Sequence, residues 1–298
     1  MDRRTFLGAA ALAATAVATQ TPLSARQRVS PGEPGLSLRF LGTGAADWNG
    51  PDNRGEHRRL TSVLVERSFL IDFTASARDM LPEGVRPEVI FYTHSHRDHY
   101  NPAAALEAGV RQVYVNATIV RKVQQGFQEA AAQAGCPVPV ITPLVPGTSA
   151  RVGEVLVTAL PANHFVSFEE QTQIYLLEKD GVRLLYATDT GGISAAAARL
   201  AGIDAHGKGM PVTAIIMEAT MGLGHEDDYR FFSHSSVGTV LQTWRVLSET
   251  GRYTPHEGQP VYLTHLSRTM HGTQAELDAT LPAPLRAACD GLEVTFRK

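Results

Sequence analysis

The sequence predicts an α/β protein of the αββα sandwich type, in which two β-sheets pack face to face and helices cover their outer surfaces. Strand-like and helix-like hydrophobic patterns alternate along the chain. Polar side chains suited to metal binding follow several of the predicted strands. Hydrophobic residues make up 43% of the 298 residues and charged residues 19%, which supplies enough apolar material for a large folded core.

Three histidines and one aspartate crowd into a short segment after the strand-like run Val89–Tyr92. They are His94, His96, Asp98 and His99. Neutral imidazole and carboxylate groups are good ligands for zinc, manganese and iron. Because four ligands from one loop exceed what a single ion needs from it, the spacing predicts that His94 and His96 bind one ion and Asp98 and His99 a second. The alternative, a solvated polar loop, would require this concentration of the chain's 11 histidines to be accidental.

This H-x-H-x-D-H cluster resembles that of the metallo-β-lactamase superfamily, and three further residues match the ligands of that superfamily in its order. His164 comes after the strand-like run 154–158, Asp189 after 184–187, and His265 after 260–264. Singly, each would be an ordinary turn or cap residue. The resemblance implies that His94, His96 and His164 bind one ion, that Asp98, His99 and His265 bind the other, and that Asp189 bridges the two. It implies two divalent ions as cofactors, either zinc or manganese, with iron as a further option.

The C-terminal half resembles particular branches of this superfamily. Glu218-Ala219-Thr220 is similar to a segment of ribonuclease Z-like hydrolases, and His234 stands just before an expected helix over 237–247, with Ser233 or Ser235 as its N-cap. The segments around His164, Asp189, His234 and His265, and the terminal 290–294, also resemble the phosphoribosyl cyclic phosphodiesterases of the carbon–phosphorus lyase pathway. The Cys-rich structural metal site of that family has no counterpart here, since residues 42–58 contain no cysteine.

The resemblance implies a dinuclear phosphodiesterase that acts on a small phosphate ester, which could be cyclic, through a hydroxide held between the two ions. In this reading Asp98 binds metal and orients the nucleophile, and His234 donates a proton without binding metal. Glu218 either orients a ligand histidine or is simply a carboxylate at a strand end. The alternative is a lactone, thioester or other carbonyl hydrolase on the same ions. A metal-binding scaffold without turnover is a third alternative, which the complete ligand set disfavours.

The first 25 residues resemble a bacterial twin-arginine export signal. Arg3 and Arg4 precede Phe6-Leu7 and a short alanine-rich apolar stretch that ends near residue 18. That stretch is too short and too weakly apolar to span a membrane. The sequence therefore predicts an export signal over 1–25, a hydrolase domain over 26–298, a periplasmic location and no stable membrane anchor. Cys136 and Cys289 could form a disulfide there or remain free.

The formal net charge is −3 and no basic tract is longer than Arg58-Arg59, which argues against a nucleic-acid partner. The expected partners are a small-molecule substrate and, transiently, the twin-arginine export machinery. A homodimer is left open. The remaining histidines have no motif around them and are expected in solvent; these are His57, His206, His225, His256 and His271.

Overall fold

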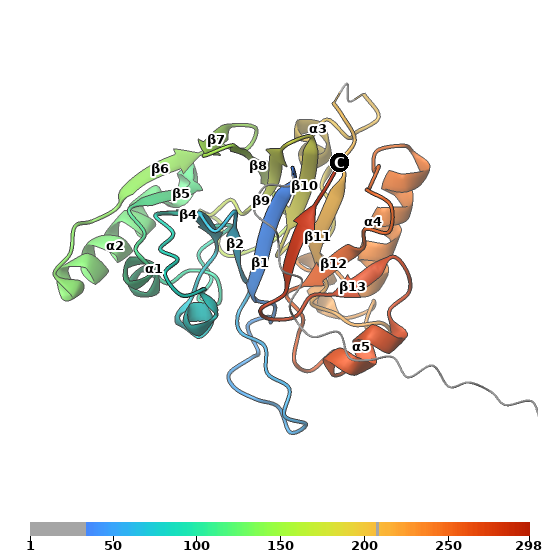
Figure 1. Ribbon diagram of the computed structural model, residues 1–298, viewed down its shortest axis with the longest axis horizontal. Helices are drawn as coiled ribbons and strands as arrows, with labels where there is room; N and C mark the ends of the chain where they lie inside the picture. Colours follow the sequence, from blue (N-terminus) through green and yellow to red (C-terminus); the bar gives the residue numbers. More distant parts are fainter. Residues whose placement is uncertain (1–33, 207–208) are drawn as a thin grey trace, which may run out of the picture.

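The computed structural model describes residues 34–206 and 209–298. The expected export signal over 1–25 lies outside these residues. Within the part described, no helix is long and apolar enough to cross a lipid bilayer. The chain forms two β-sheets that pack face to face, with helices on the outer side of each (Figure 1).

The first sheet comes mainly from the N-terminal half of the chain, and its strand order is β14-β1-β2-β3-β4-β5-β6. The C-terminal strand β14 completes it by pairing antiparallel with β1, so the two ends of the described chain meet in one sheet. The strands from β3 to β6 run parallel. The strands are β1 (Leu36–Gly42), β2 (Ser62–Val65), β3 (Phe69–Ile71), β4 (Val89–Phe91), β5 (Gln112–Asn116), β6 (Val140–Leu144) and β14 (Glu293–Phe296).

The second sheet has the order β13-β12-β11-β10-β9-β8-β7. Its strands from β10 to β13 run parallel, whereas β7, β8, β9 and β10 are joined antiparallel. Because β9 is antiparallel to both β8 and β10, those two strands end at the same edge. The strands are β7 (Ser149–Val152), β8 (Val155–Pro161), β9 (Gln173–Lys179), β10 (Val182–Ala187), β11 (Ala214–Glu218), β12 (Val261–Thr264) and β13 (Leu285–Ala287).

Alternate strand residues fill the space between the sheets. Phe69 and Ile71 of β3 face Tyr175 and Tyr186 of the second sheet in one buried cluster, while Leu70 between them points to the opposite face. A strand turns successive side chains to opposite faces, so a strand buried on both faces is apolar throughout. This accounts for the short, continuous apolar runs of the sequence.

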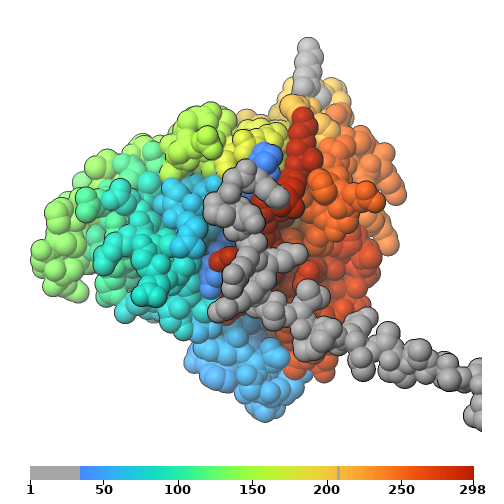
Figure 2. Space-filling model, viewed as in Figure 1, coloured from blue at the N-terminus to red at the C-terminus, as the bar shows by residue number. Residues whose placement is uncertain are grey.

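Helices cover both outer faces. Val123 and Phe127 of α2 (Val120–Ala134) pack with α1 (Pro102–Ala108) on the outside of the first sheet. On the second sheet, Val237 and Val240 of α4 (Val237–Glu249) join the outer cluster, to which α3 (Ala195–Leu200) and α5 (Gln274–Thr280) also contribute. In the space-filling view the two halves lie next to each other, cyan to green on one side and orange to red on the other (Figure 2). The expected αββα sandwich is confirmed.

One expectation at the start of α4 is wrong. The N-cap is Ser236, whose side chain accepts a hydrogen bond from the Thr239 amide, and not Ser233 or Ser235. Ser235 Oγ instead donates to the Thr190 carbonyl at 2.7 Å and accepts from the Gly192 amide at 3.0 Å. Its hydroxyl therefore ties the loop before α4 to the loop after β10, which leaves the cap to the next serine.

Candidate metal centre

The predicted ligands lie at the carboxyl-terminal edge of the two sheets. His94 to His99 follow β4, His164 follows β8, Asp189 follows β10 and His265 follows β12. Asp189 and His265 have φ angles of 46° and 53°, in the left-handed region that side chains other than glycine seldom adopt. Such backbone costs energy and persists where the surrounding structure holds it, often at functional sites. The strand ends thus turn both side chains toward the same point.

The first ligand group consists of His94, His96, His164 and Asp189. The Nδ1 atom of His96 lies 3.0 Å from His94 Nε2 and 3.1 Å from His164 Nε2. Asp189 Oδ2 lies 3.4 Å from His94 Nε2 and 3.6 Å from His164 Nε2. Three ring nitrogens and one carboxylate oxygen therefore surround one point.

The second ligand group consists of Asp98, His99, His265 and Asp189. His99 Nε2 and His265 Nε2 lie 3.3 Å apart, and each lies 3.3 Å from Asp98 Oδ2. Asp189 Oδ1 lies 3.0 Å from His265 Nε2, and its Oδ2 lies 3.3 Å from His99 Nε2. Asp189 belongs to both groups, which is the position of a bridging carboxylate.

These donor sets fit divalent ions such as zinc. Ligands held about 2.1 Å from a tetrahedral ion lie roughly 3.4 Å from one another, close to the separations in both groups. The groups contain imidazole nitrogens and carboxylate oxygens, the ligands that zinc, manganese and iron accept. The geometry brings all seven predicted residues together in the two predicted sets.

The outward-facing nitrogens of two ligand histidines donate directly to oxygen acceptors. His99 Nδ1 donates to Asp72 Oδ2 at 2.8 Å, and His164 Nδ1 donates to the Ser233 carbonyl at 3.1 Å. A proton on Nδ1 leaves the lone pair of Nε2 directed into the cluster, as metal binding requires. Asp72 follows β3 and has a φ of 52°. Asp72 was not among the predicted site residues, although its place after an apolar strand is the same kind of signal as that of Asp189.

Two threonines serve the other pair of ligand histidines. Thr93 Oγ1 donates to Asp72 Oδ2 at 2.7 Å, so its oxygen accepts from His94 Nδ1 at 2.9 Å. Thr220 Oγ1 donates to the carboxylate of Glu218 and accepts from His265 Nδ1 at 2.8 Å. Each relay runs from a buried carboxylate through a hydroxyl to an imidazole, and it fixes which ring nitrogen faces the cluster.

The charges of the cluster suit metal binding. Burial lowers the pKa of His94 well below its usual value, and it also lowers the pKa of His96 and of His164. Burial alone would raise the pKa of Asp189, but His265 and His99 hold it well below its usual range. Neutral imidazoles and an ionised carboxylate are the forms that ligate metal.

The pKa of His99 shifts in the opposite direction to those of His94, His96 and His164. Burial opposes its charge, but the carboxylates of Asp189, Asp98 and Asp72 raise its pKa well above the usual value. The second ligand group is therefore strongly negative, and a bound divalent cation would neutralise it in place of that proton.

His234 lies beside both ligand groups. Its ring stacks on the His265 ring, with a centroid separation of 5.6 Å and an interplanar angle of 8°. It also packs edge to face with the His164 ring, with the ring centroids 4.7 Å apart. Its Nδ1 lies 3.1 Å from both carboxylate oxygens of Glu218. Glu218, His234 and His265 form a third cluster of ligand-type groups, but there the carboxylate pairs directly with imidazole. Burial disfavours the His234 charge, yet Glu218 raises the pKa of His234 to about 9.

Glu218, the last residue of β11, is fully buried and connects several parts of the site. It accepts from the Thr190 amide at 2.5 Å, from Thr220 Oγ1 and from His234 Nδ1. Through Thr220 it orients the ligand His265. This contact is the one that the first of the two alternatives for Glu218 requires, and the role itself stays a prediction.

A separate contact holds the loop that carries His94 and His96. Between them, Ser95 donates through its amide to Glu170 Oε1 at 2.7 Å and through its hydroxyl to Glu170 Oε2 at 2.5 Å. Lys122 Nζ donates to Ser95 Oγ at 2.5 Å. The buried Glu170, from the segment between β8 and β9, therefore anchors the ligand loop of the other sheet. Nothing near Glu170 in the sequence pointed to this contact.

Four of the histidines expected in solvent are exposed, namely His57, His206, His225 and His256. His271 is the exception, and the expectation for it is wrong. Its Nε2 donates to the Ala219 carbonyl at 2.6 Å, and burial lowers its pKa to about 4. The two cysteines are free, so the disulfide alternative is not realised.

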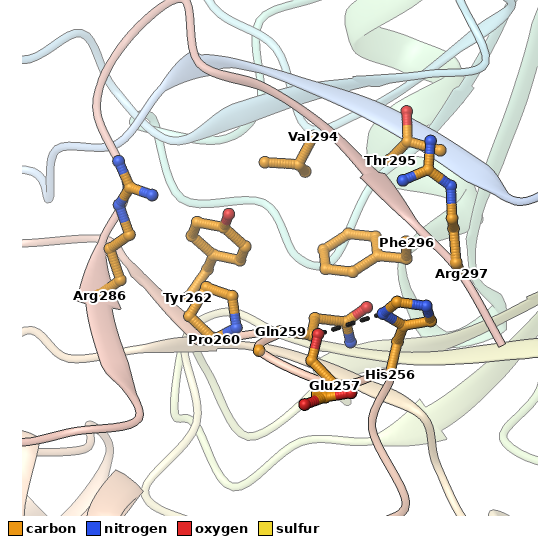
Figure 3. A pocket seen from close by; sticks show the side chains of 11 residues that line it. His256, Glu257, Gln259, Pro260, Tyr262, Arg286, Val294, Thr295, Phe296 and Arg297 are labelled. Atoms are coloured by element: carbon orange, nitrogen blue, oxygen red, sulfur yellow. Dashed lines mark hydrogen bonds between the residues drawn. The ribbon is translucent and has the colours of Figure 1, made fainter. Parts of the chain in front are cut away.

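A cavity of about 350 Å³ lies away from the ligand groups. It opens beside Pro260 and Tyr262, at the amino-terminal end of β12, whereas His265 follows the carboxyl-terminal end of that strand. Arg286 and Phe296 line it from β13 and β14 (Figure 3). The cavity contains none of the seven ligand residues.

Solved structures with the same fold include several metalloproteins. The chain superposes on the metallo-β-lactamase fold protein YhfI from Bacillus subtilis with a TM-score of 0.63 and 14% identity, covering 88% of this chain and 99% of YhfI. The short form of human tRNase Z superposes with a TM-score of 0.61 and 16% identity, covering 88% of this chain and 100% of the tRNase Z chain. Zinc-bound PqqB from Methylobacterium extorquens superposes with a TM-score of 0.60 and 16% identity, covering 87% of this chain and 99% of PqqB. At such identities the likeness concerns the fold.

No curated protein matches the sequence of this chain. A family model described as the beta-lactamase superfamily domain, however, matches residues 67–225. That match covers more than half of the chain and includes six of the seven ligand residues, all except His265. Together with the αββα fold, it shows that the chain belongs to the metallo-β-lactamase superfamily.

Proposed function

We propose that this protein is a dinuclear metal-dependent phosphodiesterase. The observation that carries the proposal is His234, an imidazole that lies against the ligand histidines while its Nδ1 pairs with Glu218 at 3.1 Å. A hydrolase of phosphate esters needs a group that can give a proton to a departing alkoxide. His234 is suited to this task because Glu218 holds it in place and favours its protonated form.

The roles of the other residues follow from their positions. His94, His96 and His164 would hold one divalent ion and Asp98, His99 and His265 the other, with Asp189 shared. Ions bound there supply Lewis acidity for a phosphoryl oxygen and lower the pKa of a coordinated water toward 7. Asp98 is the least buried of the four carboxylates at the site, so it can also orient an incoming water.

His234 would act through Nε2. Its Nδ1 is engaged by Glu218 and lies 3.2 Å from Thr220 Oγ1, which leaves Nε2 as the ring nitrogen that can face a substrate. The side chain is 17% exposed, so the ring is held firmly yet is reachable from solvent. A proton on Nε2 would pass to the leaving oxygen, and the buried Glu218 would stabilise the charged ring beforehand.

The proposal is tested by a substrate panel on purified protein supplied with zinc or manganese. Bis(p-nitrophenyl) phosphate, a lactone and a cephalosporin separate phosphodiester hydrolysis from carbonyl hydrolysis. Turnover of the phosphodiester above the other two supports the proposal. Turnover of the lactone alone would replace it with the carbonyl-hydrolase alternative, and turnover of none with intact metal binding would favour a scaffold.

We also propose that residues 1–25 direct export to the periplasm by the twin-arginine route. The support is the sequence alone, in which Arg3 and Arg4 precede the apolar stretch. Fractionation of cells that express the full chain tests this. The double variant Arg3→Lys/Arg4→Lys should leave the protein in the cytoplasm, and its export at the wild-type level would contradict the proposal.

A further inference from the structure

Two connecting loops beside the ligand groups, one of which contains the 3-10 helix Tyr229–Phe232, carry all the largely exposed Phe, Tyr and Trp side chains of the described residues. Phe168 is 98% exposed and Phe232 is 77% exposed, and three others are more than half exposed. Elsewhere in the described chain the Phe, Tyr and Trp side chains are buried or partly covered. We call this set the aromatic rim; it consists of Phe165, Phe168, Tyr229, Phe231 and Phe232.

The rim is continuous with the candidate site. Phe165 directly follows the ligand His164, and Phe232 lies two residues before His234. The two loops are joined at the site, because His164 Nδ1 donates to the Ser233 carbonyl at 3.1 Å.

The loop after β10 closes the gap between them. Gly191 exchanges backbone and side-chain hydrogen bonds with Asn163 at 2.9 Å. A Cβ on Gly191 would lie only 3.0 Å from the Phe231 carbonyl and from Asn163 Nδ2, so the three loops pack closely there and a side chain would force a neighbour to shift by a few tenths of an ångström. The aromatic residues thus stand on a scaffold that the ligand residues themselves fix.

Exposed aromatic surface of this kind marks a place where apolar groups bind. A fully exposed phenyl ring such as that of Phe168 can remove about 150 Å² or more of apolar area from water when it is covered. Within each loop the rings already meet in edge-to-face pairs, Phe165 with Phe168 at 5.3 Å and Phe231 with Phe232 at 5.8 Å. Such pairs present flat faces to a third ring or to an apolar chain.

The charges around the rim select against polyanions and anionic membranes. The segment before Tyr229 contributes Glu226, Asp227 and Asp228, and Arg230 is paired with Asp228 at 2.9 Å. Nucleic acids and anionic lipids are bound chiefly through unpaired lysines and arginines, which these two loops do not provide.

Resting on the proposed function, we infer that the substrate is a small ester that carries a bulky apolar group, such as an aryl or benzyl group, next to the bond that is hydrolysed. The rim binds that group, while the ligand groups and His234 face the ester. Phe168 and Phe232 are the principal specificity-determining residues, because they offer the most uncovered surface.

The test compares substrates that share a leaving group and differ only in the apolar part. Methyl and benzyl p-nitrophenyl phosphate form one pair, and p-nitrophenyl acetate and phenylacetate form the other. We expect the wild type to prefer the benzyl member by kcat/KM. In Phe168→Ala/Phe232→Ala that preference should fall about tenfold or more, mainly through KM. The control is Val138→Ala/Val140→Ala, which shortens exposed apolar side chains at and near β6. Because β6 is the edge strand of the first sheet and does not carry the rim, this variant should keep the preference.

The second pair separates the two proposals. Hydrolysis of the carboxylic esters alone would overturn the phosphodiesterase proposal, while a rim-dependent benzyl preference within that pair would still support the inference. If neither pair is hydrolysed, calorimetry with benzylphosphonate and methylphosphonate on the metal-loaded protein decides, with tighter binding of the benzyl compound lost in the rim variant as the supporting result.

Equal kcat/KM for the methyl and benzyl members of a pair, or a benzyl preference that is unchanged in the rim variant, would overturn the inference. So would a rim whose loss changes only sedimentation with phosphatidylcholine–phosphatidylglycerol vesicles, or only the molar mass measured by light scattering. The first of these results would make the rim a membrane contact, and the second an interface between two copies of the chain.

Discussion

Asp72 and His99 form a hydrogen-bonded pair at 2.8 Å in which both side chains are completely buried. Neither residue could be left alone there, since an unpaired charge or donor in that position would cost several kcal/mol. Asp72 also accepts from the Thr93 amide at 2.8 Å and from the Thr93 hydroxyl. One carboxylate therefore positions His99 directly and His94 through Thr93, so that it supports a histidine in each ligand group.

The variant Asp72→Asn should weaken metal binding. The amide oxygen can still accept from the Thr93 amide, but the NH2 group in place of Oδ2 cannot accept from His99 Nδ1 or from the Thr93 hydroxyl. Partners of this kind typically contribute about 10–100-fold to metal affinity. Competition with a chromogenic chelator measures the affinity. The control Asp227→Ala removes an exposed carboxylate and should leave affinity unchanged. An unaltered affinity in Asp72→Asn with a lowered Tm would show that the pair is merely structural.

Loss of the shared carboxylate should affect both ions at once. Asp189 faces His94 and His164 of one group and His99 and His265 of the other, at 3.0 to 3.6 Å. We expect the wild type to bind close to two divalent ions per chain. Asp189→Ala should bind fewer ions and lose most of its activity. Elemental analysis after anaerobic purification provides the count, and a variant that still holds two ions would contradict the bridging role.

The convergence of the seven candidate ligands could be predicted from the sequence because each follows an apolar run that becomes a strand, and strands of the same direction bring such residues to one edge. The supporting residues were harder to find. Thr93 and Thr220 act through hydroxyls that link a ligand histidine to a carboxylate distant in sequence, and no local pattern marks such a relay. Glu170 reaches Ser95 across 75 positions, a contact that only the packing of the two sheets creates.

The N-cap of α4 and the burial of His271 escaped prediction for similar reasons. Ser233 and Ser235 are as good cap residues as Ser236, but the loop beside the site uses the Ser233 carbonyl and the Ser235 hydroxyl for contacts with His164 and Thr190. His271 lies in a polar stretch of sequence, yet its ring is buried because Nε2 donates a hydrogen bond to the Ala219 carbonyl, which is distant in sequence.

His271 should make the protein less stable in mild acid. Burial lowers its folded-state pKa to about 4, whereas an unfolded histidine titrates near 6.5. The unfolded chain therefore takes up a proton that the folded chain refuses, so stability is fully present above pH 6.5 and falls as the pH drops from about 6.5 to about 4. At pH 4.5 the loss from this one group is on the order of 2–3 kcal/mol.

Urea unfolding of the wild type and of His271→Gln, with chelator present at pH 7.5 and pH 4.5, isolates this contribution. The glutamine can still donate to the Ala219 carbonyl and does not titrate, so the variant should lose less stability between the two pH values. Exposed His256→Gln serves as the control. Equal pH dependence in wild type and His271→Gln would show that His271 is not the group responsible.

His234→Ala distinguishes a proton donor from a ligand. The ring lies against His164 and His265 but pairs with Glu218, so its removal should leave the metal content at the wild-type value. Without the donor, kcat toward an alkyl phosphodiester should fall by about 10²-fold or more. The decrease should be smaller for a p-nitrophenyl ester, because that leaving group departs without a proton. His57→Ala, which removes an exposed ring, should change none of these values.

Each other outcome for His234→Ala has a definite meaning. Loss of one ion would make His234 a ligand and would place the third ligand-type cluster, with Glu218 and His265, among the metal sites. Retention of both ions with full activity on alkyl esters would remove the proton-donor role, and with it the observation that favours phosphodiesters over carbonyl substrates. A uniform decrease for alkyl and aryl esters would mean that the ring positions the substrate or the neighbouring histidines, since an acid acts only where the leaving group needs its proton.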